Sequence, residues 1–397
     1  MTDREIALGN LLSKIADELN ITPTMQDKAV KSYESVGKWI GDGVNYDVKI
    51  MPQGSMNLGT VVRPIDDSDD YDMDLICLLK NGRYLSLYEI KNLVGDRLKE
   101  HALYKEKLEP EGKRCWTMQY DEFHMDILPC VPKSGYFVEP HLTAIKLTHK
   151  NGSSNYTERF SNPYAYHDWF ENRMKDILLV EKRAYAARSQ TEISKVPTYK
   201  MRTPLQKAIQ LLKRHRDICF QADDKDKPIS IIITTLAALS YNGESNIYEA
   251  LCNIMRNMPT FIQCRNGIYW VENPVMPEEN FAEKWAIHPS KRTAFVNWLT
   301  RAREEIIENP LKLYGINKIS QELSLCLGEA PVNRALKVLG EETRLERSAG
   351  NLYVNGLSGG LTTQRPENGI GRIKEHTFLA NKRYMKNRPI RLFEQMI

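Results

Sequence analysis

Three aspartates lie in segments that otherwise have the pattern of β-strands. Asp72 and Asp74 begin segment 72–79, where Asp alternates with apolar residues before the run becomes fully apolar, and Asp126 lies in the similar segment 123–130. Because successive side chains on a strand point to opposite faces, Asp72 and Asp74 project from the same face, a few ångströms apart. Carboxylates this close repel one another, and burying them unpaired costs free energy. A divalent cation would remove this cost.

Oxygen ligands alone favour Mg²⁺, with Mn²⁺ as the alternative, over Zn²⁺. If the strand of Asp126 lies beside that of Asp72 and Asp74, three carboxylates face the same ions. This is the arrangement for two-metal phosphoryl transfer, in which one ion orients an attacking hydroxyl and the other neutralises the triphosphate and its leaving pyrophosphate. We therefore predict that Asp72, Asp74 and Asp126 are catalytic and bind two Mg²⁺ ions. Asp126 would also help to deprotonate the attacking hydroxyl.

A possible phosphate site precedes these strands. Gln53, Gly54 and Ser55 follow a predicted strand over 46–51 and start a short helical segment. A glycine lets backbone approach an anion, and a serine opening a helix adds a hydroxyl to the free N–H groups. Alone, a Gly-Ser pair is usually only a helix cap, and Asp-x-Asp on a strand is more often an exposed face. The order of all three parts, each within or after a strand, favours a nucleotide site.

These motifs together resemble a known superfamily. Gly-Ser, a spacer, a hydrophobic-flanked Asp-x-Asp and a later strand Asp resemble the polymerase-β-like nucleotidyltransferases. The stretch QGSMNLGTVVRP followed by YDMDLICLL is similar to bacterial cyclic GMP-AMP synthase-like enzymes (CD-NTases), and so are segments 204–217 and 228–236.

The resemblance implies that Lys213 and Ser230 contact the donor triphosphate, which the predicted phosphate site at Gln53, Gly54 and Ser55 would also hold. The residues alone leave blander readings open. Without the resemblance, a solvated cation on an amphipathic helix is the favoured interpretation of Lys213, and Ser230 is an ordinary helix N-cap.

The order of predicted elements indicates an α+β fold. Two helices are expected in the first forty residues, and helices follow one another from Pro163 onward. Strands are expected over 46–51, 72–79, 115–120, 123–130 and 144–149. This predicts a two-lobed polymerase-β-like nucleotidyltransferase core, with a mixed β-sheet and flanking helices, plus an all-helical C-terminal lobe.

Three regions are expected along the chain. Residues 1–195 would form the catalytic lobe with its N-terminal helices, and 196–349 a helical lobe that completes the nucleotide cleft. A Gly-rich loop and a basic tail would occupy 350–397.

Composition predicts the cellular compartment of the protein and the kind of partner that it binds. Seven cysteines never form a Cys-x-x-Cys pair, which indicates reduced thiols in a cytoplasmic protein. The longest apolar stretch, 229–241, is too short to span a bilayer, so no membrane partner is expected. With 55 Lys and Arg against 51 Asp and Glu, the net charge of +4 suits anionic substrates but is low for a dedicated nucleic-acid binder. We expect a monomer.

The residues alone predict nucleotidyl transfer, and the resemblance adds cyclisation. The expected enzyme joins NTPs with release of pyrophosphate to make a cyclic di- or trinucleotide second messenger, which acts on a separate effector protein in anti-phage defence. Two alternatives stay open. One is a template-independent linear nucleotidyltransferase of the oligoadenylate or RNA-tailing type, and the other is a non-catalytic binding protein with the same fold. The intact set of three aspartates argues against the second.

Overall fold

The computed structural model describes residues 1–66, 70–133, 143–152, 155–189, 201–354 and 361–362. The chain forms two compact units. The larger is Leu19–Leu299, and the smaller combines Met1–Glu18 with Thr300–Ile397. Every predicted site residue belongs to the larger unit. The predicted boundary at 195/196 lies outside the described residues, and the predicted regions stay predictions.

A mixed β-sheet is the centre of the larger unit. Its strands run in the order β1 (Val48–Pro52), β2 (Tyr71–Leu79), β4 (Phe123–Pro132), β5 (Ile145–Asn151) and β6 (Asn155–Ser161), and β3 (Trp116–Gln119) also pairs with β4. Only the β2–β4 pair is parallel; the other pairs of this sheet are antiparallel. The five predicted strands are confirmed, whereas β6 was not expected. β6 is mostly exposed, so it lacks the apolar alternation that marks a half-buried strand.

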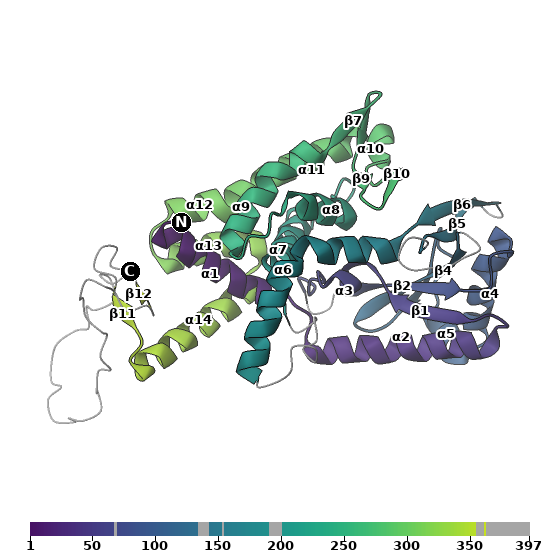
Figure 1. Cartoon of the computed structure of the whole chain (residues 1–397), viewed down its shortest axis with the longest axis horizontal. Helices are drawn as coiled ribbons and strands as arrows, with labels where there is room; N and C mark the ends of the chain where they lie inside the picture. Colours follow the sequence, from purple (N-terminus) through teal and green to yellow (C-terminus); the bar gives the residue numbers. More distant parts are fainter. Residues whose placement is uncertain (67–69, 134–142, 153–154, 190–200, 355–360, 363–397) are drawn as a thin grey trace. The chain divides into compact units, whose positions relative to one another are not determined.

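The two faces of the sheet have different cores. Odd-numbered residues of β2 and β4, such as Met73 and Met125, pack in the larger core with α2 (Pro23–Gly43) and α4 (Leu87–Lys99). Figure 1 shows these helices beside the strands. Even-numbered residues Ile76 and Leu78 face a smaller core on the other side. Because strand residues alternate in direction, Asp72 and Asp74 share this second face.

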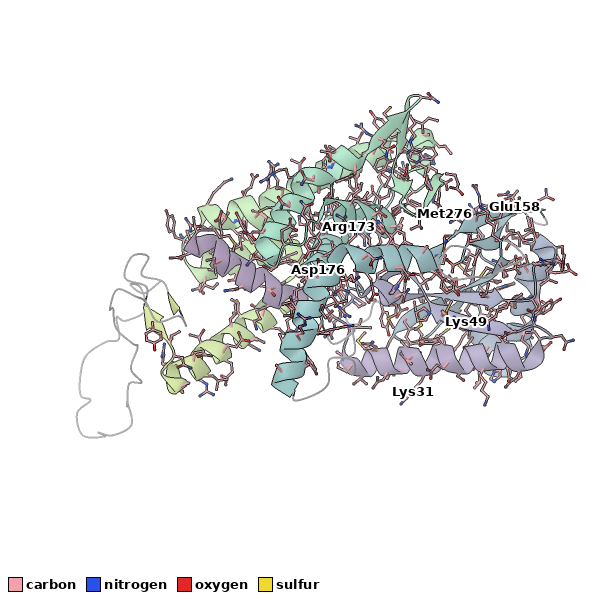
Figure 2. All side chains as sticks on the ribbon, viewed as in Figure 1. Lys31, Lys49, Glu158, Arg173, Asp176 and Met276 are labelled. Atoms are coloured by element: carbon pink, nitrogen blue, oxygen red, sulfur yellow. The ribbon has the colours of Figure 1, made fainter. Side chains whose placement is uncertain are left out.

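Helices make up most of the remaining larger unit, as expected from Pro163 onward. They are α6 (Pro163–Ser189), α7 (Pro204–Cys219), α8 (Ser230–Ser240), α9 (Ile247–Asn257), α10 (Lys284–Ile287) and α11 (Pro289–Arg303), with short α3 (Gly54–Leu58) and α5 (Ala102–Lys107) in the sheet region. Arg173, labelled in Figure 2, lies on α6 and donates hydrogen bonds to the carbonyl oxygens of Ala238, Leu239 and Tyr241. This arginine therefore supplies hydrogen-bond donors to the carbonyl oxygens at the C-terminal end of α8.

Short strands interrupt the helices, which the all-helical expectation did not include. They are β7 (Gln263–Arg265), β8 (Ile268–Trp270), β9 (Glu272–Asn273) and β10 (Met276–Asn280), following the 3₁₀ turn η3 (Met258–Phe261). Asn266 and Gly267 both have positive φ, at 50° and 79°. An Asn-Gly pair in this conformation closes a two-residue hairpin, so β7 and β8 pair antiparallel.

The smaller unit contains four α-helices and a hairpin in its described part. They are α1 (Asp3–Glu18), α12 (Asn309–Lys312), α13 (Ile316–Leu327), α14 (Glu329–Ala349), and the strands β11 (Tyr353–Val354) and β12 (Leu361–Thr362), with the π-turn η4 (Glu304–Glu308) before α12. Arg334 on α14 pairs with Glu18 at 2.9 Å. The basic tail lies outside the described residues. In the described part of the chain, no helix is long and apolar enough to cross a membrane.

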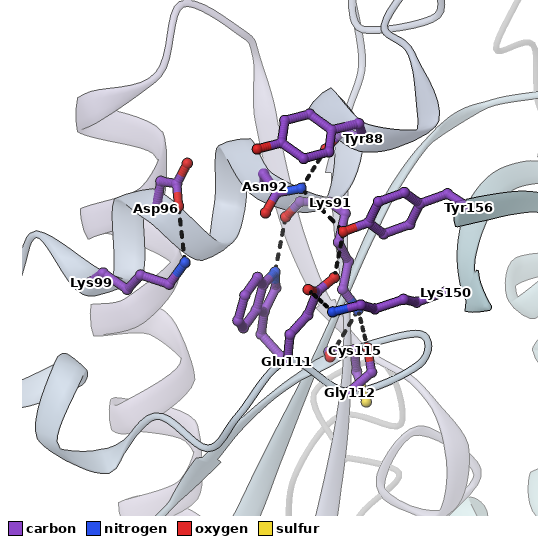
Figure 3. A network of polar contacts seen from close by, with 11 residues as sticks. Tyr88, Lys91, Asn92, Asp96, Lys99, Glu111, Gly112, Cys115, Lys150 and Tyr156 are labelled. Atoms are coloured by element: carbon purple, nitrogen blue, oxygen red, sulfur yellow. Dashed lines mark hydrogen bonds and ion pairs between the residues drawn. The ribbon is translucent and has the colours of Figure 1, made fainter. Parts of the chain in front are cut away.

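A buried lysine fixes the segment that leads into β3. The Lys91 ammonium donates to the carbonyl oxygens of Gly112 at 3.0 Å and Cys115 at 2.9 Å, and Trp116 Nε1 donates to the Lys91 carbonyl at 2.9 Å. Figure 3 shows this network beside the Glu111–Lys150 ion pair. Loss of water around the amine lowers the pKa of Lys91 to about 8. β3 is therefore anchored to α4 through buried polar contacts.

We expect Lys91→Met to lower the free energy of unfolding by about 2 kcal/mol, because two partly buried carbonyls lose their donor. The pKa of Lys91 is about 8 in the folded chain and 10.5 in the unfolded one, so between these values the unfolded state binds more protons and wild-type stability rises with pH. Urea unfolding should show the gap between wild type and variant widening over this interval.

Lys99→Met is the control, since Lys99 pairs with the exposed Asp96 and such pairs contribute less than about 1 kcal/mol. A gap for Lys91→Met that does not change with pH would contradict the assignment of this pKa.

Candidate active site

The parallel pairing of β2 and β4 brings the three predicted catalytic aspartates together. In this register Asp74 lies opposite Asp126, and Asp72 lies opposite His124. Residues that are opposite each other on paired strands point to the same face. All three carboxylates therefore project from the face that carries the smaller core, near the start of both strands.

Their electrostatics show that these groups share one environment. The pKa of Asp74 is raised to about 6, first by burial and then by the charges of Asp72 and Asp126, against the opposing charge of Lys213. The pKa of Asp72 is raised by loss of water and then by Asp126. Three carboxylates whose charges repel one another are a donor set of oxygens alone, which fits divalent Mg²⁺ or Mn²⁺.

Gly54 makes the closest approach to this cluster. The Gln53 N–H donates to the Asp74 carbonyl at 2.8 Å, which places the start of α3 against β2. Gly54 has φ of +58°, and a Cβ atom added there would lie 2.2 Å from Asp74 Oδ2. A glycine is needed on both counts, for the left-handed backbone and for the close approach. Ser55 follows in the first turn of α3.

Lys213 reaches the same region from α7. The residue is 5% exposed, and its ammonium donates to the backbone oxygen of Thr60 at 3.2 Å and to the Thr60 hydroxyl at 3.4 Å. Burial and Arg216 lower the pKa of Lys213 to about 7, against the opposing effect of nearby acidic groups that include Asp74 and Asp72. The structure thus replaces the solvated-cation reading with a buried ammonium beside the carboxylates.

Ser230 is the first residue of α8, whose N-cap is Ile229 rather than Ser230. The Ser230 hydroxyl accepts a hydrogen bond from Arg216 Nη1 at 2.8 Å. Arg216 therefore links Ser230 to α7, the helix that carries Lys213. The contacts of Gln53, Gly54, Ser55, Lys213 and Ser230 with a triphosphate stay predictions.

Two features of the site were missed in the sequence. The Thr117 hydroxyl, on β3, donates to Asp126 Oδ1 at 2.5 Å, and it lies opposite Asp126 in the β3–β4 register. The available signal was the alternation of buried Trp116 and Met118 in β3, which places Thr117 on the aspartate face.

The second missed feature is a buried polar stripe on α7. Gln206 and Gln210 donate to the carbonyl oxygens of Leu58 and Val61 at 3.0 and 2.7 Å. Arg214 donates to the carbonyl of Pro64 at 3.2 Å. With Lys213 they hold the backbone of residues 58–64 after α3. Polar residues spaced at 206, 210, 213 and 214 were the signal, but such a face is ordinarily solvated.

A sheet that presents three strand aspartates next to a Gly-containing turn fits the predicted nucleotidyltransferase fold. Residues 48–129, which span β1 to most of β4, match the family model described as cyclic GMP-AMP synthase DncV-like, nucleotidyltransferase domain. This segment is therefore recognised as a nucleotidyltransferase domain of the DncV-like type, the type found in bacterial cyclic GMP-AMP synthase-like enzymes, or CD-NTases.

Curated proteins and solved structures are similar to this chain over most of its length. A c-di-GMP synthase of Roseivirga ehrenbergii is 28% identical over 86% of this chain and 90% of its own length. The cyclic dinucleotide synthase CdnG of Bradyrhizobium diazoefficiens is 25% identical over 72% of each. The structure of CdnG with GTP covers 84% of this chain and 99% of its own, with 21% identity and a TM-score of 0.67. Vibrio cholerae DncV covers 84% and 89%, with 14% identity and a TM-score of 0.52.

We expect Gly54→Ala to lower nucleotidyl transfer about 100-fold or more, because the new methyl group displaces the turn or the Asp74 carboxylate. It should also cost about 1–3 kcal/mol of backbone strain. Gly243→Ala is the matched control, since Gly243 has φ of +87° and open space at its Cβ position. Turnover assays should find Gly243→Ala fully active when folded. Equal activity of both variants would show that the contact with Asp74 is unimportant.

Asp74→Asn should stabilise the metal-free protein near neutral pH. The pKa of Asp74 is about 6 when folded and 3.8 when unfolded, so the folded state binds more protons between these values and stability falls as pH rises through them. Asn removes that loss, about 1–3 kcal/mol. In thermal unfolding with a chelator, we expect the gain near pH 7 to disappear near pH 4.

Added Mn²⁺ should then raise the unfolding temperature of the wild type far more than that of Asp74→Asn, because the ion binds only the intact folded site. A variant that is less stable than the wild type at both pH values would disprove the repulsion argument.

Proposed function

We propose that this protein is a cyclic dinucleotide synthase. It joins two NTPs with release of pyrophosphate at Asp72, Asp74 and Asp126, and then closes the linear product into a ring. The observation that carries the proposal is the convergence of these carboxylates on one face of β2 and β4, with Gly54 against Asp74. The similarity to proteins named c-di-GMP synthase and CdnG supports a cyclic dinucleotide as the product.

The three aspartates would hold two divalent ions, Mg²⁺ or Mn²⁺, which orient the attacking hydroxyl and neutralise charge on the departing pyrophosphate. In each transfer a ribose 2′- or 3′-hydroxyl oxygen forms a bond to the α-phosphorus, and the bond from that phosphorus to the pyrophosphate oxygen breaks. Asp126 accepts the hydroxyl proton. The hydrogen bond from Thr117 holds one Asp126 oxygen, which fixes the orientation of the carboxylate.

The phosphate end of the nucleotide is held by the groups around α3, α7 and α8. Gln53, Gly54 and Ser55 supply backbone and hydroxyl donors, and Lys213 and Ser230 contact the triphosphate. Lys213 brings positive charge into a buried site, where the effective dielectric constant is lower than in water and the charge stabilises developing negative charge more strongly. The same aspartates serve the second transfer after the linear dinucleotide rebinds.

The proposal includes GTP among the substrates, which the GTP-bound structure of the similar CdnG supports. A small cyclic product leaves its enzyme, so its signal requires a separate effector protein that binds it. We propose that this signalling serves anti-phage defence, and that the enzyme is a cytoplasmic monomer.

Product analysis tests the function directly. Purified protein would be incubated with all four labelled NTPs and Mg²⁺ or Mn²⁺, treated with phosphatase, and its products separated. We expect a phosphatase-resistant product from wild type and none from Asp72→Ala/Asp74→Ala. Omission of single NTPs would give the bases. Asp47→Ala is the matched control, since Asp47 is an exposed carboxylate that pairs with Lys80 at 2.8 Å, and it should retain full activity.

Other outcomes would each replace the proposal. Phosphatase-sensitive linear products, or extension of added RNA, would indicate the linear nucleotidyltransferase. Tight NTP binding with no product under any metal, with or without RNA, would indicate a binding protein.

A further inference from the structure

An ion-pair cluster joins the end of α7 to the segment before α8. Asp217 Oδ1 accepts from Arg216 Nη2 at 2.7 Å and from the Lys227 ammonium at 2.8 Å. Arg216 Nη1 also donates to the Pro228 carbonyl at 3.1 Å and to the Ser230 hydroxyl at 2.8 Å. One carboxylate oxygen thus serves two cations.

The charges of this cluster act on groups of the aspartate site. Lys227 lowers the pKa of Asp72, and Asp217 raises it. Arg216 lowers the pKa of Lys213, and Asp217 raises it. Three cations, Lys213, Arg216 and Lys227, therefore lie within electrostatic reach of the site, with one carboxylate, Asp217, set among them.

The two cations bound to Asp217 differ in their freedom to move. The Arg216 side chain is 9% exposed and its guanidinium has three different acceptors. The Lys227 side chain is 34% exposed, and a lysine ammonium is a point charge on a flexible stem. Lys227 can exchange its partner at low cost, whereas Arg216 is fixed between α7 and α8.

We propose that Lys227 is a further triphosphate-binding residue, and that Asp217 is the counter-ion that holds it until nucleotide binds. A triphosphate offers several charged oxygens, so it replaces the single oxygen of Asp217 as the partner of Lys227. Arg216 keeps Asp217 and Ser230 in place during the exchange. This inference rests on the proposed function, since it needs a nucleoside triphosphate at the same site.

Binding of inorganic tripolyphosphate and of GTP to the full-length protein, measured by calorimetry without turnover, tests the exchange. We expect Lys227→Met to weaken both affinities about tenfold and Asp217→Asn to strengthen them several-fold, because the competing carboxylate is gone. Lys225→Met is the matched control, since it removes an exposed lysine from the same segment, and it should bind as wild type does. Thermal unfolding verifies that each variant is folded.

A double-mutant cycle separates the exchange from a purely structural role. If Asp217 acts through Lys227, the gain in affinity caused by Asp217→Asn becomes smaller when Lys227→Met is also present. Wild-type affinity in Lys227→Met, or weaker binding in Asp217→Asn, would overturn the inference. Neither result would contradict the synthase proposal. If no cyclic product is found, this binding test can still be interpreted, because it does not depend on turnover.

Discussion

Asp74 and Asp126 face each other in register on parallel strands, and Asp72 lies one pleat away on the same face, so three negative charges are held where they repel one another. The repulsion by itself disfavours this arrangement. It is imposed by the larger core, because Met73, Leu75 and Met125 must point towards α2 and α4, and alternation then directs the aspartates to the other face. Burial of apolar side chains thus sets the geometry of the charges.

Around this cluster the chain fixes its neighbours by polar contacts to backbone. Lys91 anchors the start of β3, which carries Thr117 to Asp126. The polar stripe of α7 holds residues 58–64, which follow the Gly54 turn. Buried donors of this kind are expensive to leave unpaired, so the backbone they bind has little freedom to shift.

Sequence patterns predicted most of the sheet and the aspartate cluster, because both follow from alternation and from the chemistry of like charges. They did not predict β6, which is mostly exposed and has little apolar pattern, or the hairpin at Asn266 and Gly267 within a largely helical region. The contacts of Thr117 and of the α7 stripe were also missed. A buried polar face looks like a solvated one in a sequence, since the difference lies in which backbone packs against it. The Lys213 and Ser230 roles came from resemblance rather than from pattern.

Lys213 and Lys227 show how two lysines near one site can have different physical roles. Lys213 is 5% exposed and hydrogen-bonded to two oxygens of Thr60, so its charge is fixed where it opposes the repulsion among the aspartates. Lys227 is more exposed and shares one carboxylate oxygen with Arg216. A preorganised charge stabilises a transition state without reorganisation, whereas an exchangeable one can follow a ligand that enters and leaves. In the proposed two-step synthesis the linear intermediate is flipped or rebound between the transfers, and the two kinds of cation would serve these two demands.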